Sequence, residues 1–198
     1  SEAMQRSAEE AGIISMMMRN PDFRVDYGTI VSCHMINPDW DKPIVTISSN
    51  RSTHYYSDEV MNEQASALGK AVSKAIIESG KRVVLVASHS LSHRHFVTEA
   101  PLPEDMSREH IYNHSQYVWD MKVIEMMRDG KMEEVIGILP EMIEQTMAEA
   151  EGGGLTWMMS AMGMPDYPAE IYGYQSVIGT GNVIAAWDPN SATRAMVL

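Results

Sequence analysis

Residues 81–96 read Lys81-Arg82-Val83-Val84-Leu85-Val86-Ala87-Ser88-His89-Ser90-Leu91-Ser92-His93-Arg94-His95-Phe96. Within this stretch, residues 83–87 form a continuous apolar run of the kind found in a central strand covered on both faces. A polar segment with three histidines follows at once. Because ligands collect beyond the carboxyl ends of strands in open α/β sheets, this stretch indicates both the fold class and the place of a site.

Two further elements precede this run. Ile44-Val45-Thr46-Ile47 is expected to be a buried strand. Ser57 supplies N-cap chemistry for a helix whose inward apolar stripe continues until Gly80. The order is strand, helix, strand, with no hairpin turn between them. The pattern therefore predicts an α/β fold with a central mixed sheet flanked by helices.

The rest of the chain is expected to be mainly helical, with a hairpin near its end. An amphipathic helix opens the chain and ends before a break at residues 20–22. Later helices are expected at residues 107–127, 132–139 and 140–150, the last with Pro140 in its first turn. Two β-rich runs, 172–178 and 183–187, are joined by Gly179-Thr180-Gly181-Asn182, which favours a β-hairpin.

Length and charge restrict the classes of function. A chain of 198 residues can bury one sizeable core, so a single domain, or part of one, is expected. The net charge of -12 would repel phosphate backbones and anionic lipids, so we expect neither nucleic acid nor a membrane as a partner. Cys33 is the only cysteine, which excludes an internal disulfide and agrees with a reducing cytoplasm.

Three histidines, His89, His93 and His95, follow the predicted central strand. A neutral imidazole at the mouth of a sheet can take a proton from a bound phenol and later return it, since the ordinary pKa of histidine lies near neutrality. The alternative is a set of hydrogen-bonded loop histidines with no catalytic role. A zinc site made by the three would need converging ligands, which the sequence does not reveal.

Two other segments could carry chemistry. Glu149 and Glu151 stand at a predicted helix end before three glycines, where a carboxylate could complete a two-histidine, one-carboxylate face on iron(II). A solvated acidic helix end is the alternative. Tyr27, in the predicted turn Asp26-Tyr27-Gly28, could donate a hydrogen bond to a substrate oxygen, or could be a packed turn aromatic.

Taken together, four short motifs resemble the class III extradiol dioxygenases of the protocatechuate 4,5-dioxygenase type. In chain order they are Asp26-Tyr27-Gly28, Pro43-Ile44-Val45, Leu91-Ser92-His93, and Glu149 ahead of Thr156-Trp157-Met158. The resemblance spans nearly the whole chain. Tyrosine in place of histidine in the first motif, and the stretch Ser92-His93-Arg94-His95-Phe96, are most similar to the aminophenol-cleaving members of the family.

The resemblance implies a ring-cleaving dioxygenase subunit that uses Fe(II) and O2 to open 2-aminophenol or a catechol. It implies His93 as the acid-base residue, Tyr27 as a contact to substrate and oxygen, His95 as a further catalytic candidate, and Glu149 or Glu151 as the metal-binding carboxylate. Two iron-binding histidines are then expected upstream of Ser1. Residues 1–198 would be the C-terminal two-thirds of one domain whose N-terminal part is missing. A related alpha subunit is implied as a partner, in a heterotetramer.

Two other functions remain open from the sequence. The chain could be the catalytically silent alpha-type subunit, which would have a structural role. It could also be a relative in which the same scaffold houses a zinc hydrolase or a redox-regulatory protein.

Overall fold

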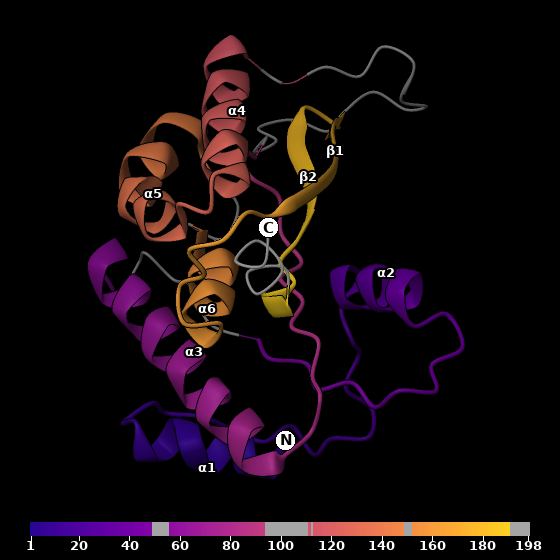
Figure 1. Ribbon diagram of the computed structural model, residues 1–198. Coiled ribbons are helices and arrows are strands. Elements are labelled where there is room, and N and C mark those ends of the chain that lie inside the picture. Colours follow the sequence, from indigo (N-terminus) through magenta and orange to yellow (C-terminus); the bar gives the residue numbers. More distant parts are fainter. Residues whose placement is uncertain (49–55, 94–110, 112, 149–151, 191–198) are drawn as a thin grey trace. The chain divides into compact units, whose positions relative to one another are not determined.

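The computed structural model describes residues 1–48, 56–93, 111, 113–148 and 152–190 (Figure 1). Over these ranges the chain forms six helices and one two-stranded antiparallel sheet. The chain divides into two compact units, one of residues 1–88 with 153–163 and the other of residues 89–152 with 164–198. The mixture of helices and strands confirms the predicted α/β class.

The first unit is built on the long helix α3 (Asp58–Ser79), which the sequence predicted. The Ser57 hydroxyl accepts a hydrogen bond from the Val60 N–H at 3.4 Å, and Gly80 ends the helix in the left-handed conformation with φ of 63°. Helices α1 (Glu2–Glu10), α2 (Tyr27–Ile36) and α6 (Gly153–Ala161) belong to the same unit. Of these, α1 and α6 pack against α3.

Small side chains bring α6 and α1 close to α3 (Figure 1). A Cβ atom built on Gly69 would lie 2.4 Å from the backbone oxygen of Trp157, so only glycine permits this approach of α3 to α6. The Ser160 hydroxyl donates to the backbone oxygen of Ser66 at 2.9 Å. The Ser7 hydroxyl of α1 donates to the backbone oxygen of Ala71 at 2.7 Å. Helix α1 is shorter than the opening helix predicted from the sequence.

The prediction of two strands in the first unit is wrong. Residues 44–47 and 83–87 have no strand assignment, and the sheet described contains neither of them. Their side chains are also less buried than predicted, since Val83, Val84 and Val86 are 45%, 81% and 40% exposed. A strand requires a hydrogen-bonded neighbour, and neither run has one in the part of the chain that the structure describes. The central sheet expected from these runs is accordingly not formed there.

The second unit contains α4 (His114–Arg128), α5 (Met132–Thr146), β1 (Glu170–Val177) and β2 (Thr180–Ala186). The Asn113 side chain caps α4 by accepting from the Gln116 N–H at 2.9 Å. The predicted cap at Ser107 lies outside the described residues. Helices α4 and α5 pack against each other and are joined by a short turn (Figure 1), and their shared core is apolar. It consists of Val123, Ile124, Met127, Met132, Val135, Leu139 and Met142.

Helix α5 corrects the prediction of two helices separated at Pro140. Pro140 lies inside one continuous helix. Proline removes one backbone hydrogen bond, but this residue is on the exposed side of the helix, where water can replace the lost donor. The buried residues Met132, Val135, Leu139, Met142 and Thr146 keep one helical stripe across it. Burial of that stripe outweighs the local penalty of proline.

The predicted hairpin is confirmed, with its turn two residues earlier than expected. Strands β1 and β2 pair antiparallel, and Val177 pairs with Thr180, leaving a two-residue loop. Ile178 and Gly179 in this loop have φ of 53° and 72°, as a type I′ turn requires at both of its central positions. Gly181 is therefore part of β2 and not of the turn.

None of the helices within these described ranges is both long enough and apolar enough to cross a bilayer.

Candidate functional site

The structure describes two of the five predicted site residues. Tyr27 belongs to the first unit and His93 to the second. His95, Glu149 and Glu151 lie outside the described residues.

The sequence suggested that Tyr27 lies in an isolated turn. In the structure it is the first residue of α2. The Asp26 carboxylate caps the helix by accepting from the Thr29 N–H at 2.9 Å and from the Thr29 hydroxyl at 2.7 Å. The hydrogen bond from the Thr29 backbone lowers the pKa of Asp26 below its usual value. The Tyr27 side chain is 84% exposed, so its phenol is open to an approaching molecule.

Ser88 anchors the start of α2 to the end of the apolar run 83–87. Its hydroxyl donates to the backbone oxygen of Gly28 at 3.3 Å and accepts from the Ser32 hydroxyl at 2.9 Å. Tyr27 is thus carried by a capped helix whose first turn is tied to the segment that leads into the histidine-bearing stretch.

The backbone around His93 is held on all sides within the second unit. The Leu91 N–H donates to the backbone oxygen of Gly181 at 2.9 Å, and the Gly181 N–H donates back to Ser92 at 3.1 Å. The His93 N–H donates to the Thr146 oxygen at 3.4 Å. The Gln116 amide donates to the oxygens of both His93 and Thr146, at 3.1 Å and 3.0 Å. A hairpin strand and two helices therefore fix the position of His93.

Asp120 is the most unusual group in this network, because it is a carboxylate that is 0% exposed. It accepts from the Ser92 N–H at 2.9 Å, from the Ser92 hydroxyl at 2.7 Å and from the Tyr174 phenol at 2.7 Å. Burial raises the pKa of Asp120, and the hydrogen bonds from Tyr174 and Ser92 partly oppose that rise. Burial, together with the hydrogen bond to Asp120, raises the pKa of Tyr174. All these donors are neutral, so within the described part of the chain the carboxylate is stabilised by hydrogen bonds and not by a cation.

Gly181 makes this arrangement sterically possible. A Cβ atom built at this position would lie 1.8 Å from Oδ2 of Asp120 and 2.8 Å from the Tyr174 hydroxyl. The strand must therefore carry a glycine where it passes over the carboxylate.

None of the sequence motifs indicates Asp120, Gln116 or Tyr174. A signal existed, because Gln116 and Asp120 continue the buried stripe of α4 that also contains Val123 and Met127. Polar residues at positions that the helical period assigns to the core are expected to be hydrogen-bonded for a specific purpose.

A metal centre is not assembled by the described residues, among which no three His, Cys, Asp or Glu side chains gather. The carboxylates predicted as ligands, Glu149 and Glu151, lie outside those residues.

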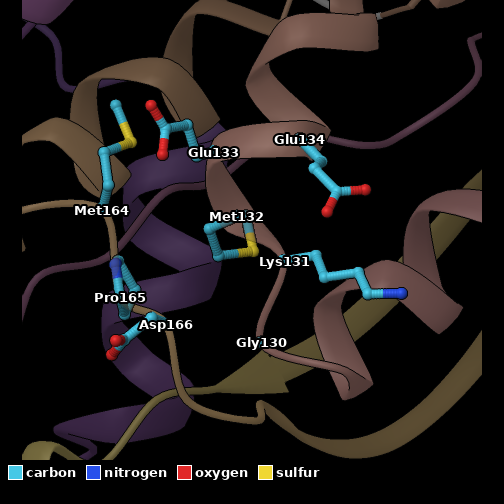
Figure 2. A pocket seen from close by; sticks show the side chains of 8 residues that line it. All are labelled: Gly130, Lys131, Met132, Glu133, Glu134, Met164, Pro165 and Asp166. Atoms are coloured by element: carbon cyan, nitrogen blue, oxygen red, sulfur yellow. The ribbon is translucent and has the colours of Figure 1, made fainter.

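An open surface pocket lies at the turn between α4 and α5 (Figure 2). It is lined by Gly130, Lys131, Met132, Glu133, Glu134, Met164, Pro165 and Asp166. Figure 2 shows the Lys131 side chain extending away from Pro165 and Asp166, and its ammonium group pairs with Asp129 at 3.0 Å. None of the predicted site residues lines this pocket, so it is not the candidate site.

Sequence comparison with known proteins supports the resemblance seen in the motifs. Residues 1–186 match the family described as the catalytic LigB subunit of aromatic ring-opening dioxygenase. The chain is 50% identical over 197 residues to the 2-aminophenol 1,6-dioxygenase beta subunit of a Pseudomonas species, covering 100% of this chain and 65% of that protein. It is 26% identical over 171 residues to the 3,4-dihydroxyphenylacetate 2,3-dioxygenase of Escherichia coli, covering 85% of this chain and 59% of that protein.

The chain thus spans about two thirds of the length of one relative, at 65%, and somewhat less of the other, at 59%. The family match extends from the opening helix through the end of the hairpin. It includes α2 with Tyr27 and the held backbone at His93, and the resemblance inferred from the four motifs is confirmed. The chain therefore belongs to the family of catalytic LigB subunits of aromatic ring-opening dioxygenases.

Proposed function

We propose that this chain is the larger part of the catalytic subunit of an extradiol dioxygenase that opens the ring of 2-aminophenol, or of a catechol, with O2. The observation that carries this proposal is the 50% identity over 197 residues to a 2-aminophenol 1,6-dioxygenase beta subunit. The environment of His93 supports it, because a rigidly held backbone is what a residue that transfers protons requires.

In the proposed reaction, His93 manages the protons. Its imidazole takes a proton from the hydroxyl group of the bound substrate and returns it later in the reaction. The overall change breaks one ring carbon-carbon bond beside the heteroatom-bearing carbons. Both oxygen atoms of O2 end on the two carbons that were joined, so no further oxidant or reductant is needed. His95, two residues further on, is a second candidate for a proton-carrying group in the same segment.

Tyr27 is proposed to orient the substrate and oxygen. Its phenol is exposed at the start of a capped helix, and a phenol can donate one hydrogen bond to an oxygen atom. Removal of this donor should weaken orientation more than proton transfer. Tyr27→Phe is therefore expected to reduce turnover less than His93→Ala.

Ring opening in this family is metal-dependent, and Fe(II) is the metal we propose. Glu149, or alternatively Glu151, would hold it together with two histidines upstream of Ser1, as a two-histidine, one-carboxylate face. The metal would supply acidification of the chelated substrate and the activation of O2. Orientation and proton transfer remain the work of the protein side chains.

The remainder of the domain and the partner are also part of the proposal. Residues 1–198 would be about two-thirds of one domain, which the 65% coverage of the aminophenol-cleaving relative supports. That relative is named a beta subunit, so we propose a related alpha subunit as partner, in a heterotetramer. The lone buried thiol of Cys33 fits a cytoplasmic setting.

The test is turnover by the full-length subunit co-expressed with its alpha partner and supplied with Fe(II). Ring-opened product should accumulate from 2-aminophenol in air and be followed by absorbance. His93→Ala should lower turnover by about 100-fold or more while the bound iron is unchanged, as expected for loss of a general base.

Three outcomes would contradict the proposal. No bound metal and no activity in the full-length subunit would favour the silent alpha-type role. Activity restored by zinc but not by Fe(II) would favour a hydrolase. Unchanged turnover in His93→Ala would remove His93 from the proton-transfer step.

A further inference from the structure

We propose that helix α4 is a positioning device for His93, in which Asp120, together with Tyr174, and Gln116 hold the backbone on either side of the imidazole-bearing residue. The proposal rests on the proposed function, because it assigns these residues to the proton-transfer step. None of them is offered as a group that touches the substrate.

Two residues of α4 hold the backbone around His93. Gln116 and Asp120 are four residues apart, so their side chains leave the same face of the helix. The Asp120 carboxylate accepts a hydrogen bond from the N–H of Ser92, the residue before His93. The Gln116 amide donates a hydrogen bond to the backbone oxygen of His93 itself. One helical turn therefore holds the chain both before and after the Cα atom of His93.

The residue of α4 that holds Ser92 is a carboxylate at a fully buried position. Asp120 is 0% exposed and would be less costly to the fold as an apolar residue of similar size. Among the described residues, its hydrogen bonds come from Ser92, which donates two, and from Tyr174, which donates one. A carboxylate that accepts two hydrogen bonds from the same residue restricts that residue to one arrangement, which an apolar contact would not do. These hydrogen bonds thus fix the position of Ser92, and with it the backbone that leads into His93.

The opposite side of Ser92 is held as well. The Gly181 N–H donates to the Ser92 oxygen, and a side chain at Gly181 would collide with Asp120. Strand β2 and helix α4 therefore enclose Ser92 between them. Tyr174, on the neighbouring strand β1, completes the carboxylate's set of donors.

Two tyrosines on β1 give a matched pair of variants for the test. Tyr174→Phe removes the phenol that donates to Asp120 at 2.7 Å and keeps the ring. Tyr172→Phe removes a phenol that donates to the exposed Glu170 at 2.9 Å, on the same strand but away from Ser92. Both variants are made in the full-length subunit with its alpha partner and Fe(II), and both are also combined with His93→Ala.

We expect Tyr174→Phe to lower kcat by about 10-fold, with little change in KM or in bound iron, because proton transfer depends steeply on geometry. Tyr172→Phe should change kcat by less than about 2-fold. In the His93→Ala background the Tyr174→Phe effect should fall to less than about 2-fold, because a positioning residue acts through the residue that it positions.

Hydrogen exchange gives a readout that is independent of turnover. The amide of Ser92 should exchange at least about 5-fold faster in Tyr174→Phe than in Tyr172→Phe, since the hydrogen bond from the Ser92 N–H to Asp120 is weakened. Asp120→Asn, which keeps the volume of the side chain, should show a larger effect of the same kind. Melting temperatures establish that the variants are folded when these rates are compared.

The outcomes separate the positioning role from the proposed function. If His93→Ala leaves turnover unchanged, the proton-transfer role fails and the positioning role fails with it. If His93→Ala lowers turnover but Tyr174→Phe does not, or lowers it by the same factor in both backgrounds, only the positioning role is overturned. Unchanged exchange at Ser92 in both Tyr174→Phe and Asp120→Asn would also overturn it.

Discussion

Replacing Gly181 by alanine tests the packing of β2 against Asp120. A Cβ atom at this position would lie 1.8 Å from Oδ2 of Asp120, whereas ordinary contacts begin at 3.4 Å. The methyl group and the carboxylate would have to separate by well over an ångström. Because the backbone of Gly181 is paired with Leu91 and Ser92, we expect the carboxylate to be displaced and its hydrogen bonds to Ser92 to break.

The cost can be estimated from these two effects. Overpacking of a buried position costs about 1–3 kcal/mol, and one lost hydrogen bond to a charged group costs about 1.5–3 kcal/mol. We therefore expect Gly181→Ala to lower the free energy of unfolding by about 3 kcal/mol. Urea denaturation of the full-length subunit, followed by circular dichroism, should show a midpoint lower by about 1 M or more.

Gly173→Ala is the matched control in the same hairpin. A Cβ atom at Gly173 has no neighbour within 4 Å, so its effect on the free energy of unfolding should stay within about 1 kcal/mol. Equal unfolding midpoints for Gly181→Ala and Gly173→Ala would show that β2 does not press on Asp120, and the reasoning about this site would be wrong.

Three further predictions concern other parts of the chain. Gly69→Ala should lower the melting temperature, because its Cβ would meet the α6 backbone at 2.4 Å, whereas Gly137→Ala, with nothing within 4 Å, should raise it through an increase of about 0.8–1 kcal/mol in helix stability. Glu149→Ala should lose bound metal by elemental analysis of the full-length subunit and Glu151→Ala should keep it; the reverse result would reassign the ligand. Since burial raises the pKa of Asp120, the folded state holds that proton more tightly than the unfolded state. The stability of the wild type relative to Asp120→Asn should therefore decrease as the pH rises above about 4, and urea titrations in which it increases would contradict the assigned burial.

Elements whose signals are local were predictable from the sequence. Helix α3 has its cap at Ser57 and its stop at Gly80, and the structure has the same bounds. The hairpin also follows from short-range turn chemistry. Helix α2 was not predictable from its boundary signal, Asp26 three residues before Thr29, because the sequence Asp26-Tyr27-Gly28 is equally typical of a turn. At Pro140 the local penalty of proline indicates a helix end, but the stripe of buried residues continues across it and keeps one helix.

Elements that depend on distant partners were not predictable in this way. The apolar composition of residues 83–87 indicates a strand, but only a neighbouring strand can make it one. At the site, motif resemblance predicted Tyr27 and His93. It could not predict Asp120 or Tyr174, because the hydrogen bond from Ser92 to Asp120 joins residues 28 apart and the one from Tyr174 to Asp120 joins residues 54 apart in the sequence. Such pairings depend on packing and leave only a weak sign, a polar residue on a buried helical stripe.

The unpaired run at residues 83–87 has a practical consequence for preparing the protein. Branched apolar side chains next to backbone groups that lack a ladder partner within the described ranges are a template for pairing between molecules. Residues 1–198 prepared by themselves should therefore aggregate as their concentration rises, with an increase in light scattering. Lysine in place of Val84, the most exposed of these side chains at 81%, should suppress this association by charge repulsion.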